Sequence, residues 1–131
     1  MEPTIKCGKH LAENANLSGS RFHDVNLADA EFDDVNMSRV RFHDINMSDI
    51  SVTAVQIGGA KFKHIGLPPD KCDKQERQRP VTFEEMTLCD STFRKVNLSN
   101  VKFTDCDISG MTIDGILVTD MLNAYKKKEN Q

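Results

Sequence analysis

Apolar residues return every five positions through most of this chain. Two unbroken runs of five-residue units fill residues 15–69 and 81–120, with eleven units in the first run and eight in the second. The middle residue of each unit, which we call the centre, is Leu, Phe, Met, Ile or Val in all 19 units. A period of five matches neither the period of about 3.6 of a helix nor the period of about 2 of a plain strand. The spacing therefore predicts a corner every five residues, with two side chains of each unit facing inward and three facing out.

The units resemble those of the pentapeptide-repeat family, whose consensus is Ala-(Asp/Asn)-Leu-x-x. ANLSG at 15–19, VNLAD at 25–29 and VNLSN at 96–100 are near-literal matches. The first position departs from the consensus, because it is often Val or Ile instead of Ala. The resemblance implies an all-β fold, a right-handed quadrilateral parallel β-helix with four units in each coil. The 19 units then make about 4.75 coils of a solenoid.

Four units per coil would stack residues that are 20 positions apart. Phe22, Phe42 and Phe62 then share side one, and Phe32 lies opposite, on side three. We expect the centres to fill a dry column, in which large and medium side chains alternate. On the other two sides an amide precedes most centres, and stacked amides predict hydrogen-bonded ladders from coil to coil. These amides are Asn16, Asn26, Asn36, Asn46, Gln56 and Asn97.

The interruptions of the period predict five segments within one domain. Residues 1–14 are out of phase and form an N-terminal cap, ahead of the repeats at 15–69. Residues 70–80 are highly charged and lie between prolines, which is typical of an exposed loop. The repeats resume at 81–120, and residues 121–131 form a C-terminal helix and tail.

The C-terminal segment is predicted to form a short helix over about 121–128, with Asp120 as its N-cap. Met121, Leu122 and Tyr125 would form its apolar face. This face has two interpretations. It covers the last coil as a cap, or it contacts a second copy of the chain, because gyrase-interacting members of the family pair through C-terminal segments.

Charge is predicted to separate between opposite sides of the coil, provided that Phe83 opens side three after the loop. Side one then carries the bases Arg21, Arg41, Lys61, Lys63, Arg94 and Lys95. Side three, which we call the acidic side, carries Glu31, Asp33, Asp34, Glu84, Glu85 and Asp105. The net charge of −3 hides this polarity. The acidic side is either a docking surface for a basic groove or only a solvated wall.

The leading functional hypothesis is a non-catalytic protein that binds a macromolecular partner, as a scaffold or structural protein would. The alternative is more specific. The Qnr-type quinolone-resistance members of the family bind DNA gyrase or topoisomerase IV, and a narrow anionic coil could mimic a DNA duplex. Lys74, Arg77 and Arg79 make the loop a second candidate contact, although these bases, together with Lys71, oppose DNA mimicry nearby.

Other functional classes find no support in the sequence. No catalytic, metal-binding or cofactor-binding constellation is identifiable, so no cofactor is expected. His23 and His43 are 20 residues apart, but two imidazoles on an open face are interpreted as surface residues. The pI of about 5.8 argues against direct nucleic-acid binding. With no apolar run of about 18 residues and no apolar core of a signal peptide, we expect no membrane contact and a cytoplasmic location. Four cysteines at unrelated spacings are expected to be unpaired thiols.

Overall fold

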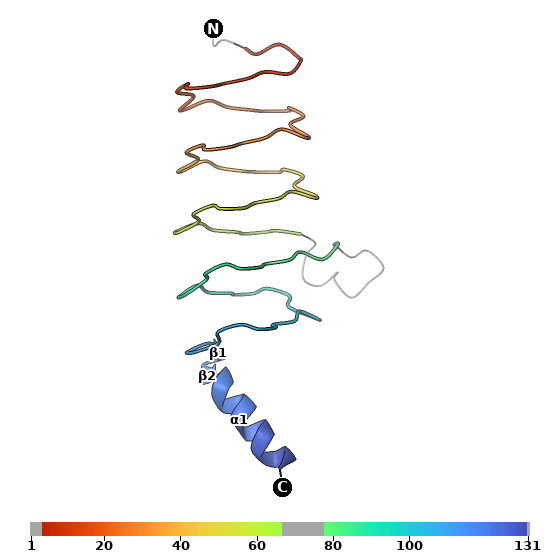
Figure 1. Cartoon of the computed structure of the whole chain (residues 1–131). Helices are drawn as coiled ribbons and strands as arrows, with labels where there is room; N and C mark the ends of the chain where they lie inside the picture. Colours follow the sequence, from red (N-terminus) through yellow and green to blue (C-terminus); the bar gives the residue numbers. More distant parts are fainter. Residues whose placement is uncertain (1–3, 67–77, 131) are drawn as a thin grey trace. The chain divides into compact units, whose positions relative to one another are not determined.

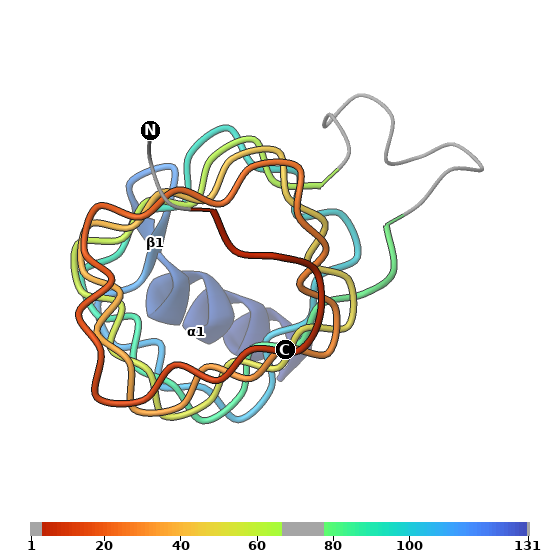
Figure 2. The same ribbon diagram turned by 90° about the horizontal axis from the view of Figure 1, so that it is seen from above.

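The chain winds in successive turns in a computed structural model, which describes residues 4–66 and 78–130. It divides into two units, Met1–Thr53 and Ala54–Gln131. Within each unit, successive turns follow one outline when viewed from above (Figure 1, Figure 2). The regular elements of the described residues are β1 (Thr112–Ile113), β2 (Ile116–Leu117) and α1 (Val118–Glu129).

Every unit of five that is described in full up to residue 110 ends in a residue with left-handed backbone. The φ angle is 56° at Asp24, 52° at Asp34 and 55° at Asp44, and the same step continues to Gly110 at 74°. Most of these positions hold Asp, Asn or Gly, the residues that adopt positive φ most readily. The predicted corner at every fifth residue is therefore confirmed, and the fifth position of the unit forms it.

Two kinds of corner alternate along the chain. After a Leu, Met or Ile centre, the centre carbonyl accepts a hydrogen bond from the backbone N–H three residues on, as from Ser20 to Leu17 at 3.1 Å and from Ala60 to Ile57 at 2.9 Å. With positive φ at the third residue, this is the geometry of a type II turn. After a Phe or Val centre, such as Phe22, the described backbone bends without this bond. Like corners are therefore ten residues apart.

Ala54 is the one alanine at a left-handed corner of the described chain, with φ of 55°. An L-residue with a Cβ atom has an unfavourable energy in this conformation, which glycine avoids. We expect Ala54→Gly to raise the free energy of unfolding by about 0.5–1 kcal/mol, net of the greater chain entropy that glycine has when unfolded. Urea denaturation measures the change. Ala28→Gly, at a position without positive φ, should be neutral or destabilising, and a destabilised Ala54→Gly would contradict the expectation.

The repeated asparagines act locally instead of forming the expected amide ladders. The Oδ1 atoms of Asn26, Asn36 and Asn46 each accept a hydrogen bond at 2.9 Å from the backbone N–H two residues on. The hydroxyls of Ser18, Ser38 and Ser48 also donate to the asparagine oxygen two residues before them, as from Ser38 to Asn36 at 2.6 Å. These are Asx-turns, which fix the chain direction just before a hydrogen-bonded corner. The oxygen assigned to the ladder is therefore already engaged within its own unit.

The described residues do not form the predicted dry column. None of the described residues is buried, and Phe22, Phe42 and Phe62 are 55%, 56% and 73% exposed. The cause is that the backbone hydrogen bonds of the described coils close corners within four residues, and β1 and β2 are the only strands that the described residues form. Without strand pairing at about 4.8 Å between neighbouring coils, a centre side chain is not covered from above and below.

The repeats end earlier than the sequence pattern predicts. β1 and β2 pair antiparallel, with Thr112 opposite Leu117 and Ile113 opposite Ile116. Asp114 and Gly115 between them have φ of 49° and 79°. Positive φ at both central residues is the type I′ turn that Asp-Gly favours in hairpins. The stretch expected to form two further corners therefore reverses direction instead.

α1 begins at Val118, three residues before the predicted start. Leu117 is the N-cap, without a side-chain cap bond, and Asp120 lies inside the first turn, so its predicted N-cap role is wrong. The first helical N–H instead bonds within the hairpin segment, from Val118 to the carbonyl of Met111 at 3.0 Å. Asp120 still suits its position, because a carboxylate in the first turn and the lysines at 126–128 in the last turn both oppose the helix dipole.

Candidate functional site

Three acidic-side residues lie in the unit Met1–Thr53, around the centre Phe32. Glu31 precedes the centre, and Asp33 and Asp34 follow it. All three are exposed. Asp34 occupies the left-handed corner, with φ of 52°. Three exposed carboxylates therefore fall within four consecutive residues that end at one corner.

The other three acidic-side residues lie in the unit Ala54–Gln131. Glu84 and Glu85 follow the centre Phe83, and Asp105 ends a later unit. All are exposed, and Glu85 and Asp105 are corner residues with φ of 51° and 53°. Each of the two large units into which the chain divides thus carries its own group of acidic residues. The arrangement of all six on one continuous side stays a prediction.

Backbone conformation accounts for some of these acids without any function. Asp is tolerated at left-handed corners throughout the coil, including Asp24 and Asp44, which are not among the acidic-side residues. Asp34 and Asp105 follow the same rule. Glu31, Asp33 and Glu84 do not occupy corners and are not needed for any turn. These three carboxylates are the part of the acidic side that the corners leave unexplained.

The corner type partly tests the position of the chain after the loop. The described turn at Phe83 lacks the hydrogen bond, as do the turns at the other Phe centres, and the bonded type returns at Leu88. The corner at Phe83 is therefore of the same kind as the other Phe corners, and its place on side three stays a prediction.

The bases assigned to side one all lie within the described residues, whereas most of the loop does not. Exposed side chains are found at all six, which are Arg21, Arg41, Lys61, Lys63, Arg94 and Lys95. Arg79 is also exposed. Lys71, Lys74 and Arg77 lie outside the described residues, so the loop contact stays a prediction.

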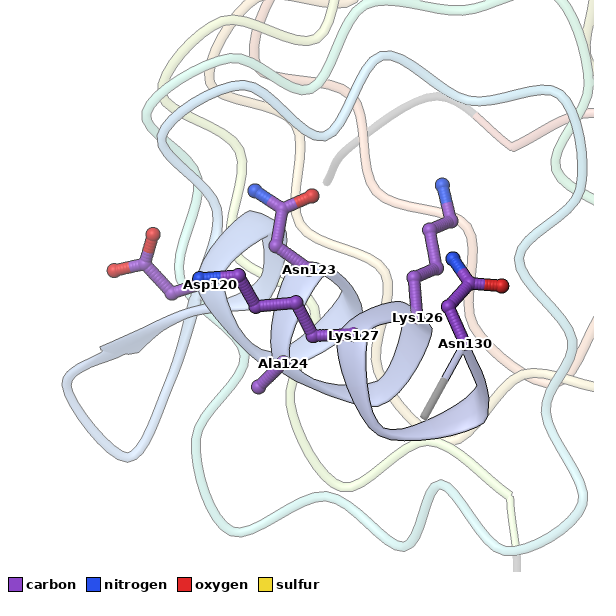
Figure 3. A pocket seen from close by; sticks show the side chains of 6 residues that line it. All are labelled: Asp120, Asn123, Ala124, Lys126, Lys127 and Asn130. Atoms are coloured by element: carbon purple, nitrogen blue, oxygen red, sulfur yellow. The ribbon is translucent and has the colours of Figure 1, made fainter.

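The C-terminal helix presents an apolar stripe and a polar hollow. On the stripe, Met121 is half-buried, whereas Leu122 and Tyr125 are 43% and 62% exposed. The Tyr125 hydroxyl donates a 2.8 Å hydrogen bond to Oε1 of Glu129, which raises the pKa of Tyr125. The hollow is open and lined by α1 alone (Figure 3), through the side chains of Asp120, Asn123, Ala124, Lys126, Lys127 and Asn130. It mixes charges of both signs on one exposed helix and offers no enclosed cleft.

Among the described residues, no group of three or more His, Cys, Asp or Glu side chains could hold a metal ion. Cys7, Cys89 and Cys106 are free, as predicted, and Cys72 lies outside the described residues. The Cys106 thiol donates to the Thr104 carbonyl at 3.3 Å. No described helix has the length and apolar character that crossing a membrane requires.

Sequence reasoning missed one ionisable residue with a defined structural role. Asp107 replaces the repeated asparagine, and its Oδ1 accepts bonds from the Ser109 hydroxyl at 2.6 Å and from the Ser109 N–H at 2.9 Å. These two bonds lower the pKa of Asp107, the hydroxyl having the larger effect. The signal was present in the sequence as Asp-Ile-Ser, which parallels Asn-Leu-Ser and Asn-Met-Ser in other units.

The two hydrogen bonds to Asp107 predict that the folded protein loses stability in acid. A carboxyl whose pKa is lowered by folding stabilises above its unfolded pKa of about 3.9 and loses that effect as pH falls through the folded pKa. We expect Asp107→Asn to retain the turn and to flatten the stability profile between about pH 4 and pH 2. Urea midpoints across that range measure it. Asp90→Asn, which removes a carboxylate at a left-handed corner, is the control, and equal profiles for both variants would contradict the assignment.

The family comparison agrees with the repeat geometry. The family model of pentapeptide repeats matches eight copies, at residues 13–49 and 81–114. Together the matches cover more than half of the chain. No curated protein and no solved structure matches it. The second match ends at Asp114, inside the hairpin turn, near the point where the structure leaves the coil. Because the matched repeats span most of the described corners, this chain belongs to the pentapeptide-repeat family.

Proposed function

We propose that this chain is a non-catalytic, cytoplasmic binding protein whose acidic side docks into a basic groove of a protein partner. The observation that carries the proposal is the presence of Glu31, Asp33 and Glu84, which are exposed carboxylates that no corner requires. A pentapeptide-repeat solenoid is typical of structural or binding proteins, and neighbouring acids on an extended surface suit electrostatic docking. A scaffold role with a different partner uses the same surface chemistry.

The proposal includes a closed fold. In it, the 17 units that precede the hairpin, eleven from the first run and six from the second, wind into one right-handed, four-sided parallel β-helix of about 4.25 coils, with four units in each coil as the family resemblance implies. Closure would cover the apolar centres that are exposed in the structure, and removing apolar surface from water is the main favourable term in folding. Residues 1–14 would cover the first coil, and the loop 70–80 would project from a corner.

The most specific partner is a type II topoisomerase. The adjacent acid pairs Asp33–Asp34 and Glu84–Glu85 support this choice, because paired charges along a narrow rod are what a groove for duplex DNA would accept. A supercoiling assay with DNA gyrase, with and without a quinolone, tests this partner. If supercoiling is unchanged at micromolar protein both with and without the quinolone, a type II topoisomerase is excluded as the partner. The general docking proposal does not depend on this result.

The test of the acidic side is a binding experiment with matched charge changes. The variant Glu31→Gln, Asp33→Asn and Glu84→Gln removes three charges without altering any corner. We expect it to weaken the captured partner's affinity at least about tenfold and to reduce the salt dependence of binding. The control, Asp24→Asn, Asp44→Asn and Asp90→Asn, removes three charges at corners outside the acidic side while keeping residues that accept positive φ. Equal affinities for the two variants would mean that the acidic side is only solvated.

A homodimer through α1 is the proposed assembly. The exposed Leu122 and Tyr125 support it, as does the charge order of the helix, because Asp120 at one end would face the lysines at 126–128 of an antiparallel copy. Sedimentation of the whole chain and of Leu122→Ser measures it. A monomer at all accessible concentrations would restrict the helix to a capping role.

A further inference from the structure

Half-buried residues of the described chain concentrate near its C-terminal end. Of the seven such residues in the described ranges, only Ile57 and Asn97 lie elsewhere. The other five fall between positions 108 and 121 and comprise Ile108, Met111, Val118, Thr119 and Met121. The chain therefore has one local region of packing, which begins at the last coil corner and ends in the first turns of α1.

The contacts that hold this region join residues close in sequence. β1 and β2 are joined by the two-residue Asp114-Gly115 turn. The bond from Val118 N–H to the Met111 carbonyl spans seven positions and ties α1 to the start of the hairpin. Closing such short loops carries a small entropy cost, and hairpins form within about 1–10 μs.

The coils lack comparable local packing. Their described backbone bonds close single corners, as from Ala30 to Leu27 and from Val40 to Met37. In the proposed fold a centre would be covered by residues 20 positions away, so a coil would gain packing only on a coil that is already formed. Contacts at such separation form later than local ones, because the loop must be closed first.

We infer that residues 108–121 are the folding nucleus of this chain and that coils are added to it toward the N-terminus. The inference uses the coil stacking of the proposed fold, whereas the local order of 108–121 does not depend on that stacking. A consequence concerns synthesis, since the repeats leave the ribosome before the nucleus does. The coils then stay unwound until residues 108–121 have emerged.

Two glycines offer a matched kinetic test in the full-length chain. Gly19 and Gly115 have φ of 77° and 79°, and nothing lies within 4 Å of a Cβ atom added at either position. Alanine therefore introduces the same backbone strain in an early corner and in the nucleus. We expect Gly115→Ala to refold about fivefold more slowly with unfolding changed less than about twofold, and Gly19→Ala to unfold about fivefold faster with little change in refolding. Stopped-flow mixing measures both limbs.

The inference is overturned if Gly115→Ala mainly speeds unfolding while Gly19→Ala mainly slows refolding. It is also overturned if both variants change the refolding and unfolding rates in the same proportion. Pulse-labelled hydrogen exchange on the unmodified chain gives an independent result that does not require either variant to fold. We expect amides of β1, β2 and the first turns of α1 to be protected before those of the unit Met1–Thr53. Earlier or simultaneous protection of that N-terminal unit would also exclude residues 108–121 as the nucleus. If stacking itself is absent, the N-terminal amides will never gain protection, which separates failure of the proposed fold from failure of the folding order.

Discussion

Phe42→Ala is expected to lower the free energy of unfolding by about 3–5 kcal/mol, the usual cost of truncating a core aromatic. The reason is the closed four-sided coil of the proposed fold, in which Phe42 would lie between Phe22 and Phe62 and its removal would leave a cavity one coil high. The apolar centres supply nearly all the apolar surface that such a column can bury. No neighbouring element is available to fill the space, so the cavity would collapse only partly.

Urea unfolding with a constant m-value measures this change, and Arg41→Ala is the control. Arg41 is the exposed neighbour of Phe42 in an outward slot, where substitutions usually change stability by less than about 0.5 kcal/mol. In the structure Phe42 is 56% exposed. A loss below about 1 kcal/mol for Phe42→Ala would mean that the side chain stays in water and that the coils do not close.

Gly115→Val is expected to have the second largest effect, a destabilisation of about 2 kcal/mol or more. Gly115 has φ of 79° in the two-residue turn between β1 and β2. A β-branched side chain is strongly disfavoured there, so valine would force the turn out of the type I′ geometry. The pairing of Ile113 with Ile116 and the position of Met111 relative to α1 would then be lost together.

Gly115→Asn is the matched control for this prediction. Asparagine adopts positive φ with little strain, so this variant should stay within about 1 kcal/mol of the unmodified chain. Thermal unfolding followed by circular dichroism measures both variants, and the helical signal reports α1 separately. If valine and asparagine destabilise equally, the strain at this turn is not what holds the C-terminal segment.

Corners were predictable because each depends on residues within one unit. The five-residue spacing located them, and the Asp, Asn and Gly residues at the fifth position supply the positive φ that they need. The Asx-turns are equally local, although the repeated asparagines were interpreted as a ladder. The hairpin was also readable, since Asp114-Gly115 between the pairs Thr112-Ile113 and Ile116-Leu117 is a strong hairpin signal. The five-residue period masked it, because Ile113 and Val118 continue the spacing of the centres.

The sequence by itself determined the corners up to residue 110, which residues lie at each of them and which family the chain belongs to. Tertiary structure alone decided where α1 begins and how far the centres are covered. Phe22 and Met121 illustrate the difference, because both are apolar in the sequence and yet one is 55% exposed and the other half-buried. The physical reason is the sequence range of the interactions involved. A backbone angle is set by a few neighbouring atoms, whereas burial requires partners 20 residues away or from another element, and their approach is a property of the folded chain as a whole.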